Sequence, residues 1–199
     1  MENKYTADIE KLSSFSLPRY ADLPELELYM DQVISVAEKY LSLLAVGERS
    51  LITPSMINNY VKNGVIPPPE RKKYRKEHLA AIIIVCALKS TVEIQDIALM
   101  IKNSCDMRGI EKAFDSFAEL YEERIRSLAS SACAVSSDDG APYKTIVDNA
   151  ILSSAARIIA EYAMKSIEAP SESEAPAPRR RRRRKDDDDE EEISVLPVI

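Results

Sequence analysis

The chain has 199 residues, which is enough for one folded domain of roughly 150 residues with accessory segments. Glycine is rare, with 4 residues, and tryptophan is absent, so the composition favours helices over a many-stranded β fold. The formal net charge of −6 argues against a polycation that binds nucleic acid over its whole surface, and any such contact must be a local basic patch.

The sequence offers little for catalysis or metal binding. Cys86, Cys105 and Cys133 are far apart, and only His78 could join them as a metal ligand, so we expect reduced thiols, no metal and no cofactor. A single histidine disfavours a histidine-based nucleophilic triad, and no Gly-rich phosphate loop is present, so we expect no enzyme. The N-terminus does not resemble a signal peptide, and no apolar run approaches the roughly 18 residues of a membrane span. These features predict a cytoplasmic protein with no membrane partner.

Apolar periodicity predicts helices along the first half of the chain. Residues from Leu26 to Leu44 recur at three- and four-residue steps and predict a helix over about 25–45. The stretch 79–88, LAAIIIVCAL, is apolar on every side and fits either a central helix or a buried strand. After a break at Ser90 and Thr91, the same spacing predicts a short helix over 94–101, so a helix-turn-helix pair is the simpler interpretation.

Two longer amphipathic stripes follow, over 110–128 and 146–162, with a loop predicted over 136–142. Helices of this kind must cover either the upstream core or a second copy of the chain, and both arrangements fit the pattern. The predicted organisation is an N-terminal arm (1–22), a core domain (23–102), a C-terminal helical region (103–168) and a tail (169–199).

The tail combines proline and serine with long blocks of one charge sign, which predicts disorder. Its basic run, 179–185, is followed at once by the acidic run 186–192, so we expect the two to neutralise each other.

The segment between Leu51 and Leu79 carries the strongest functional signal. Thr53 followed by Pro54 predicts a helix start, and Gly64 predicts the end of a short helix over about 54–63. Asparagine amides can pair with base edges in the major groove, and lysine can reach a phosphate. An ordinary solvated helix face is the alternative. The predicted contact residues on the polar side of this helix are Ser55, Asn58, Asn59 and Lys62.

A basic loop follows this helix. Three prolines at 67–69 hold the chain extended, and between Glu48 and Glu77 seven Lys or Arg residues stand against three Glu, a net charge of +4. This local asymmetry predicts contact with nucleic acid, although a solvated loop would have the same composition. We interpret Tyr74 chiefly as a packing residue within the loop. The predicted contact residues here are Arg71, Lys72, Lys73, Tyr74 and Arg75.

The residues ITPSMINNYVKNGVIPPPERKKYR resemble the second helix and the wing of MerR-type regulators. Thr53 matches the capping position of that pattern, Gly64 matches its glycine, and Tyr74 matches its wing tyrosine. Asn58 stands where these proteins carry arginine, and the wing lacks the glycine that turns its hairpin. LPELELYMDQV, MINNYVKNGVIPPPERKKY and LKSTVEIQDI together look like a bacterial family known as domain of unknown function 1836, over about residues 23–102.

The resemblance implies a winged helix-turn-helix (MerR-like) core and a regulator role. Together with the periodicity and the tail composition, the sequence predicts a mainly α protein with this core, additional C-terminal amphipathic helices and a disordered tail. Our first hypothesis is a transcriptional regulator whose partners are double-stranded DNA and a second copy of itself, so that a homodimer reads two half-sites. The alternative is a non-catalytic module for protein–protein interaction that uses the same fold. The sequence does not indicate a small-molecule effector.

Overall fold

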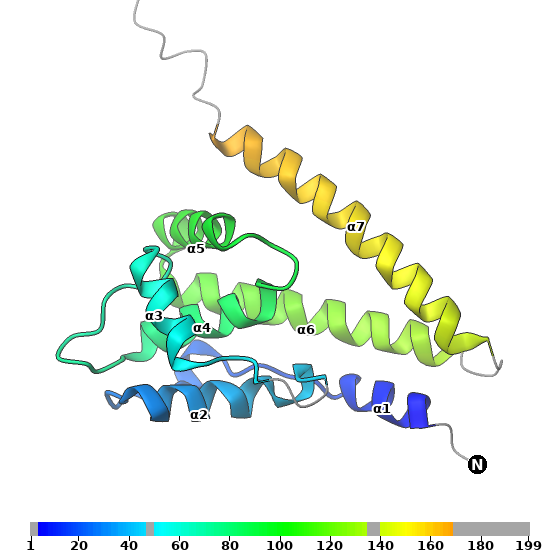
Figure 1. Cartoon of the computed structure of the whole chain (residues 1–199), viewed down its shortest axis with the longest axis horizontal. Coiled ribbons are helices and arrows are strands. Elements are labelled where there is room, and N and C mark those ends of the chain that lie inside the picture. Colours follow the sequence, from blue (N-terminus) through cyan, green and yellow to red (C-terminus); the bar gives the residue numbers. More distant parts are fainter. Residues whose placement is uncertain (1–3, 47–49, 135–139, 169–199) are drawn as a thin grey trace, which may run out of the picture.

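The computed structural model describes residues 4–46, 50–134 and 140–168, and this part of the chain forms helices but no strand (Figure 1). The mainly helical composition predicted from the sequence is therefore confirmed. The predicted tail lies outside the described residues. The helices are α1 (Lys4–Leu12), α2 (Met30–Leu41), α3 (Pro54–Lys62), α4 (Lys76–Leu88), α5 (Ile94–Arg108), α6 (Ile110–Ala134) and α7 (Ala141–Glu168), with single 3-10 turns η1 (Tyr20–Asp22) and η2 (Ser42–Leu44).

Helix α4 is the centre of the core. Every side chain from Leu79 to Cys86 is buried, and α2, α5 and α6 all pack against this helix. A helix that is apolar on every side is stable only when other elements surround it. The stretch LAAIIIVCAL, for which the sequence allowed either a central helix or a buried strand, therefore forms a central helix. Burial also raises the pKa of the Cys86 thiol to about 11, which keeps it neutral at physiological pH.

Helix α2 begins five residues later than the predicted start at residue 25. The preceding residues are extended because Leu28 pairs with Tyr74 in an antiparallel bridge, in which each backbone N–H donates to the other residue's carbonyl oxygen at 2.8 Å. Leu26 was expected on the buried stripe of this helix, but it lies in the extended segment and is 79% exposed.

The core joins parts of the chain that the sequence assigned to separate regions. Helix α1 and the turn η1 pack along α6, and Phe15 and Leu17 from the N-terminal segment are buried in the same apolar cluster as Phe114 of α6. The segment 1–22 therefore contributes to the core, and α6 supplies one of its walls. None of the helices in the described ranges is both long enough and apolar enough to cross a bilayer.

A buried carboxylate fastens the N-terminal segment to α6. Glu122 accepts hydrogen bonds from the Leu17 backbone N–H at 2.8 Å and from the Arg19 guanidinium at 2.8 Å and 3.2 Å. Arg126, one turn further along α6, adds a contact at 3.1 Å. Burial by itself raises the pKa of Glu122, but the hydrogen bonds from Arg19 and Leu17 and the neighbouring positive charges outweigh it and hold the pKa below its ordinary value. The folded chain thus stabilises the charged carboxylate.

Replacing this carboxylate is expected to destabilise the fold. Glu122→Gln keeps the shape of the side chain but leaves Arg19 without its charged partner, and we expect the free energy of unfolding at pH 7 to fall by about 2 kcal/mol. Chemical denaturation measures the change. Glu123→Gln, at an exposed neighbouring position, is the matched control and should change stability by less than about 0.5 kcal/mol.

The stability difference between the wild type and Glu122→Gln should also depend on pH. Because folding lowers the pKa of Glu122, its contribution is fully present above the unfolded-state pKa of about 4.3 and is lost as the pH falls through the lower folded-state value. Denaturation curves between pH 7 and pH 3 should therefore converge for the two proteins. A difference that stays constant over this range would show that the charge of Glu122 does not contribute.

Candidate nucleic-acid interface

Helix α3 begins and ends where the sequence predicted. The Thr53 hydroxyl oxygen accepts a hydrogen bond from the Met56 backbone N–H at 3.3 Å, and Pro54 occupies the first helical position. Gly64 follows the helix with a φ of +70°, in the left-handed region that glycine adopts without steric cost. The predicted helix 54–63 is confirmed within one residue.

One side of α3 packs into the protein and the other faces solvent. Ile57 and Tyr60 are buried in the core. The polar side carries the four residues predicted as contacts on this helix, and all of them are exposed: Ser55, Asn58, Asn59 and Lys62. Asn63 donates from its side-chain nitrogen to the Asn59 side-chain oxygen at 3.0 Å, which fixes the orientation of that amide.

The loop after α3 makes a tight turn without glycine. The Lys73 backbone N–H donates to the Glu70 carbonyl oxygen at 2.9 Å, and the two residues between them, Arg71 and Lys72, have φ angles of +50° and +65°. Positive φ at both central residues is characteristic of a type I′ hairpin turn, for which Asn-Gly is preferred. Here two long cationic side chains occupy these positions, and both are exposed.

Acidic residues neutralise much of the basic loop. Glu27 contacts Lys73 at 3.1 Å and Arg75 at 3.4 Å, and its pKa is lowered by the hydrogen bonds from these two cations. Arg75 also pairs with Glu70, while Lys76 at the start of α4 pairs with Glu25. The net charge of +4 counted along the strip therefore overstates the local field, because Glu25 and Glu27 lie outside it in sequence.

The predicted site residues fall into three groups. Arg71 and Lys72 form no ion pair with any described residue and stand at the tip of the turn, and the four polar residues of α3 are likewise exposed. Lys73 and Arg75 are partly exposed but are held by carboxylates. Tyr74 is only 3% exposed and meets His78 edge-on, so it is a packing residue and its inclusion among the contact residues is corrected.

Sequence reasoning missed the two glutamates that pair with the loop. Glu25 and Glu27 alternate with Leu26 and Leu28, and this period of two is typical of an extended segment. It could have indicated that ELEL, residues 25–28, does not belong to the helix that follows. In the described part of the chain, no three His, Cys, Asp or Glu side chains come close enough together to hold a metal ion.

The fold and this surface define an all-helical domain with one exposed polar helix and an adjoining cationic turn. The family described as Domain of unknown function (DUF1836) matches residues 18–124, and the chain belongs to this family. The match contains α2 to α5, the whole candidate surface and the first part of α6. A comparison with curated proteins and a comparison with solved structures each gave no match.

The strained turn makes a testable prediction. A residue other than glycine in the left-handed region costs about 1 kcal/mol, so Lys72→Gly is expected to raise the free energy of unfolding by about 1 kcal/mol. Denaturant titration measures this change in the free energy of unfolding. The matched control is Lys102→Gly, which removes the same charge from an exposed position inside α5 and should lower stability by about 1 kcal/mol. A loss of stability in Lys72→Gly would contradict the turn geometry.

Proposed function

We propose that the polar side of α3 and the tip of the following turn bind double-stranded DNA, and that the protein is a cytoplasmic transcriptional regulator of the MerR-like winged helix-turn-helix type. The observation that carries this proposal is the pairing of an exposed, amide-rich helix face with a turn whose two cations have no ion-pair partner among the described residues. The connection between α3 and α4 projects from the body beside the start of α2, where a long ligand could reach it (Figure 1).

The chemistry of the surface suits a DNA groove flanked by phosphates. A major groove about 12 Å wide admits one α-helix, and the Asn58 amide has the donor and acceptor needed to pair with an adenine edge. Lys62 at the end of α3 and the two cations of the turn would lie against the phosphate backbone. In this arrangement α3 supplies sequence preference and the turn supplies most of the electrostatic attraction.

The ion pairs of the loop limit the expected affinity. Lys73 can bind phosphate only by leaving Glu27, and Arg75 only by leaving Glu27 and Glu70. Among the described residues of this surface, the cations without an ion pair are therefore Lys62, Arg71 and Lys72. Three phosphate contacts predict that the logarithm of the binding constant falls with the logarithm of salt concentration with a slope of about −2.7. The electrostatic contribution to DNA affinity is therefore small, and sequence specificity would depend on the contacts of α3.

Removing the two cations of the turn should weaken DNA binding and its dependence on salt. For Arg71→Ala with Lys72→Ala we expect the salt slope to become less negative by about two units, one for each lost phosphate contact. Fluorescence anisotropy with duplex DNA selected from a random pool, over a salt series, measures the slope. Lys102→Ala with Lys112→Ala is the matched control, because both lysines are exposed and lie on other helices. Absence of binding by the wild-type chain at low salt would refute the proposal.

Neutralising the acidic partner should have the opposite effect. Glu27→Gln removes a negative charge and releases Lys73, while Arg75 keeps its ion pair with Glu70. DNA affinity at a fixed salt concentration should therefore rise, and the salt slope should become steeper by about one unit, for one additional phosphate contact. The same anisotropy titration detects the change. Glu38→Gln on α2 serves as the control for the loss of one negative charge. Equal effects of the two substitutions would mean that net charge, and not the loop, governs binding.

The alternative function is non-catalytic protein–protein interaction. The neutralised loop and the exposed apolar residues of α7 favour it, because neither feature is required for contact with DNA. Complexes recovered from cells that persist after nuclease treatment, together with failure of the anisotropy experiment, would support this alternative.

A further inference from the structure

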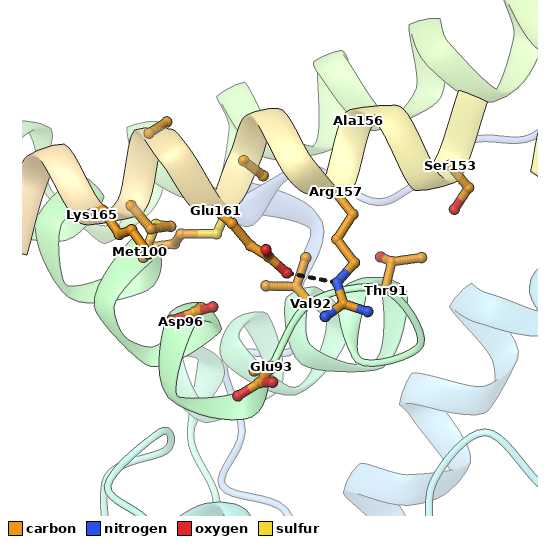
Figure 2. A pocket seen from close by; sticks show the side chains of 13 residues that line it. Thr91, Val92, Glu93, Asp96, Met100, Ser153, Ala156, Arg157, Glu161 and Lys165 are labelled. Atoms are coloured by element: carbon orange, nitrogen blue, oxygen red, sulfur yellow. Dashed lines mark hydrogen bonds and ion pairs between the residues drawn. The ribbon is translucent and has the colours of Figure 1, made fainter. Parts of the chain in front are cut away.

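An open cleft of about 630 Å³ lies between the start of α5 and the second half of α7 (Figure 2). This volume falls within the range of ligand-binding pockets, which is about 300–1,000 Å³. Small side chains that are exposed to solvent make up much of the α7 wall, and they leave room for another chain segment between the two helices. These small residues are Ser153, Ala156, Ala160 and Ala163.

The larger side chains in the cleft favour an apolar occupant. Val92 and Met100 line the α5 side, and Met164 lines the α7 side. Arg157 and Glu161 contact each other at 2.8 Å, so this ion pair is satisfied without a charged ligand. Apolar side chains that enter the cleft would leave water and gain contacts with both helices.

The sequence that follows α7 contains an apolar segment. Helix α7 ends at Glu168, the last described residue, and residues 169–199 follow it. Residues 169–192 include no Val, Ile, Leu, Met or aromatic residue, whereas residues 193–199, ISVLPVI, include five Val, Ile or Leu. Burial stabilises apolar side chains of this kind. The segment 193–199 is therefore the part of this sequence that gains from an apolar cleft.

The segment 193–199 matches the cleft in shape and length. Four β-branched residues and Pro197 favour an extended chain over a helix. In an extended chain successive side chains point to opposite sides, so apolar residues fall on both sides and suit a cleft with two walls. Seven extended residues span about 23 Å at 3.3 Å each. The α7 wall from Ser153 to Lys165 spans about 18 Å at 1.5 Å per residue.

The connection to the segment is long enough for docking within one molecule. Residues 169–192 can span about 80 Å at most, which is several times the length of the cleft. Because the segment is attached to the same chain, its effective concentration at the cleft is on the order of millimolar. Docking therefore does not require high intrinsic affinity.

Charge decides which residues of the tail enter the cleft. The acidic run 186–192 comes directly before the apolar segment. Glu93 and Asp96 line the α5 side of the cleft and would repel this run, whereas Lys165 lines the cleft close to the end of α7 and would attract it. We therefore expect residues 193–199 to enter and the acidic run to stay outside, beside Lys165.

We propose that residues 193–199 dock in the cleft between α5 and α7 of the same molecule. The docked segment would cover Val92 and Met100 and would connect the two helices through apolar contacts. The proposal does not depend on DNA binding, since no residue of the cleft belongs to the candidate nucleic-acid interface.

The first test uses tryptophan fluorescence. The sequence contains no tryptophan, so Val195→Trp in the full chain reports on the segment alone. We expect acrylamide to quench this tryptophan about threefold less than that of Ala175→Trp, which lies outside the segment, and urea to abolish the difference. Quenching should be the same at about 1 and 100 μM protein, because the contact lies within one molecule. Equal quenching of the two variants, or quenching that depends on protein concentration, would overturn the proposal.

A substitution on α7 tests whether the cleft is the docking site. Ala160→Glu places a charge in the cleft, so adding it to Val195→Trp should raise quenching to the level of Ala175→Trp. Ala155→Glu is the matched control, because Ala155 is an exposed alanine of the same helix that does not line the cleft. Circular dichroism checks that the helix content is unchanged. Equal effects of the two substitutions would contradict docking in this cleft.

A competition measurement tests the occupant without tryptophan. A labelled peptide with the sequence of residues 190–199 should bind the full chain carrying Val195→Asp and Leu196→Asp about tenfold more tightly than the wild type. The reason is that the attached segment competes for the cleft only in the wild type. Adding Ala160→Glu to the double variant should abolish peptide binding. Equal affinity for the wild type and the double variant would show that the segment does not occupy the cleft.

Discussion

The structure depends on keeping water away from α4. Between Leu79 and Cys86 this helix has no polar side chain, so it is stable only inside a complete shell of other elements, and α2, α5 and α6 provide much of that shell. The connection from α2 to α4 has to be made outside this core. Helix α3 and its loop are part of that connection, which explains why α3 buries Ile57 and Tyr60 and leaves its other side in solvent.

In the loop after α3, tertiary contacts reduce the positive charge that the sequence pattern alone indicates. The pairing of Leu28 with Tyr74 brings Glu25 and Glu27 beside cations that are about fifty residues away in sequence. Exposed ion pairs contribute little to stability, but they hold side chains in place and reduce the field that a polyanion would meet. The residual positive charge is therefore concentrated at Arg71 and Lys72, at the tip of the turn.

The proposed contact through α3 and the turn is electrostatic, so it should weaken as salt is added. This dependence distinguishes it from a contact dominated by apolar burial, which is far less sensitive to salt.

The sequence alone determined the helical class, the cap of α3, its end to within one residue, and its two-sided character, because Thr53, Pro54, Gly64 and the spacing of apolar residues act locally. It also located the long helices α6 and α7. Only the tertiary structure decided that α4 is a helix, that α2 starts at Met30, that Glu25 and Glu27 neutralise the basic loop, and that α7 remains uncovered. Each of these outcomes depends on contacts between residues far apart in the chain, and periodicity along the sequence carries no information about which surfaces will meet.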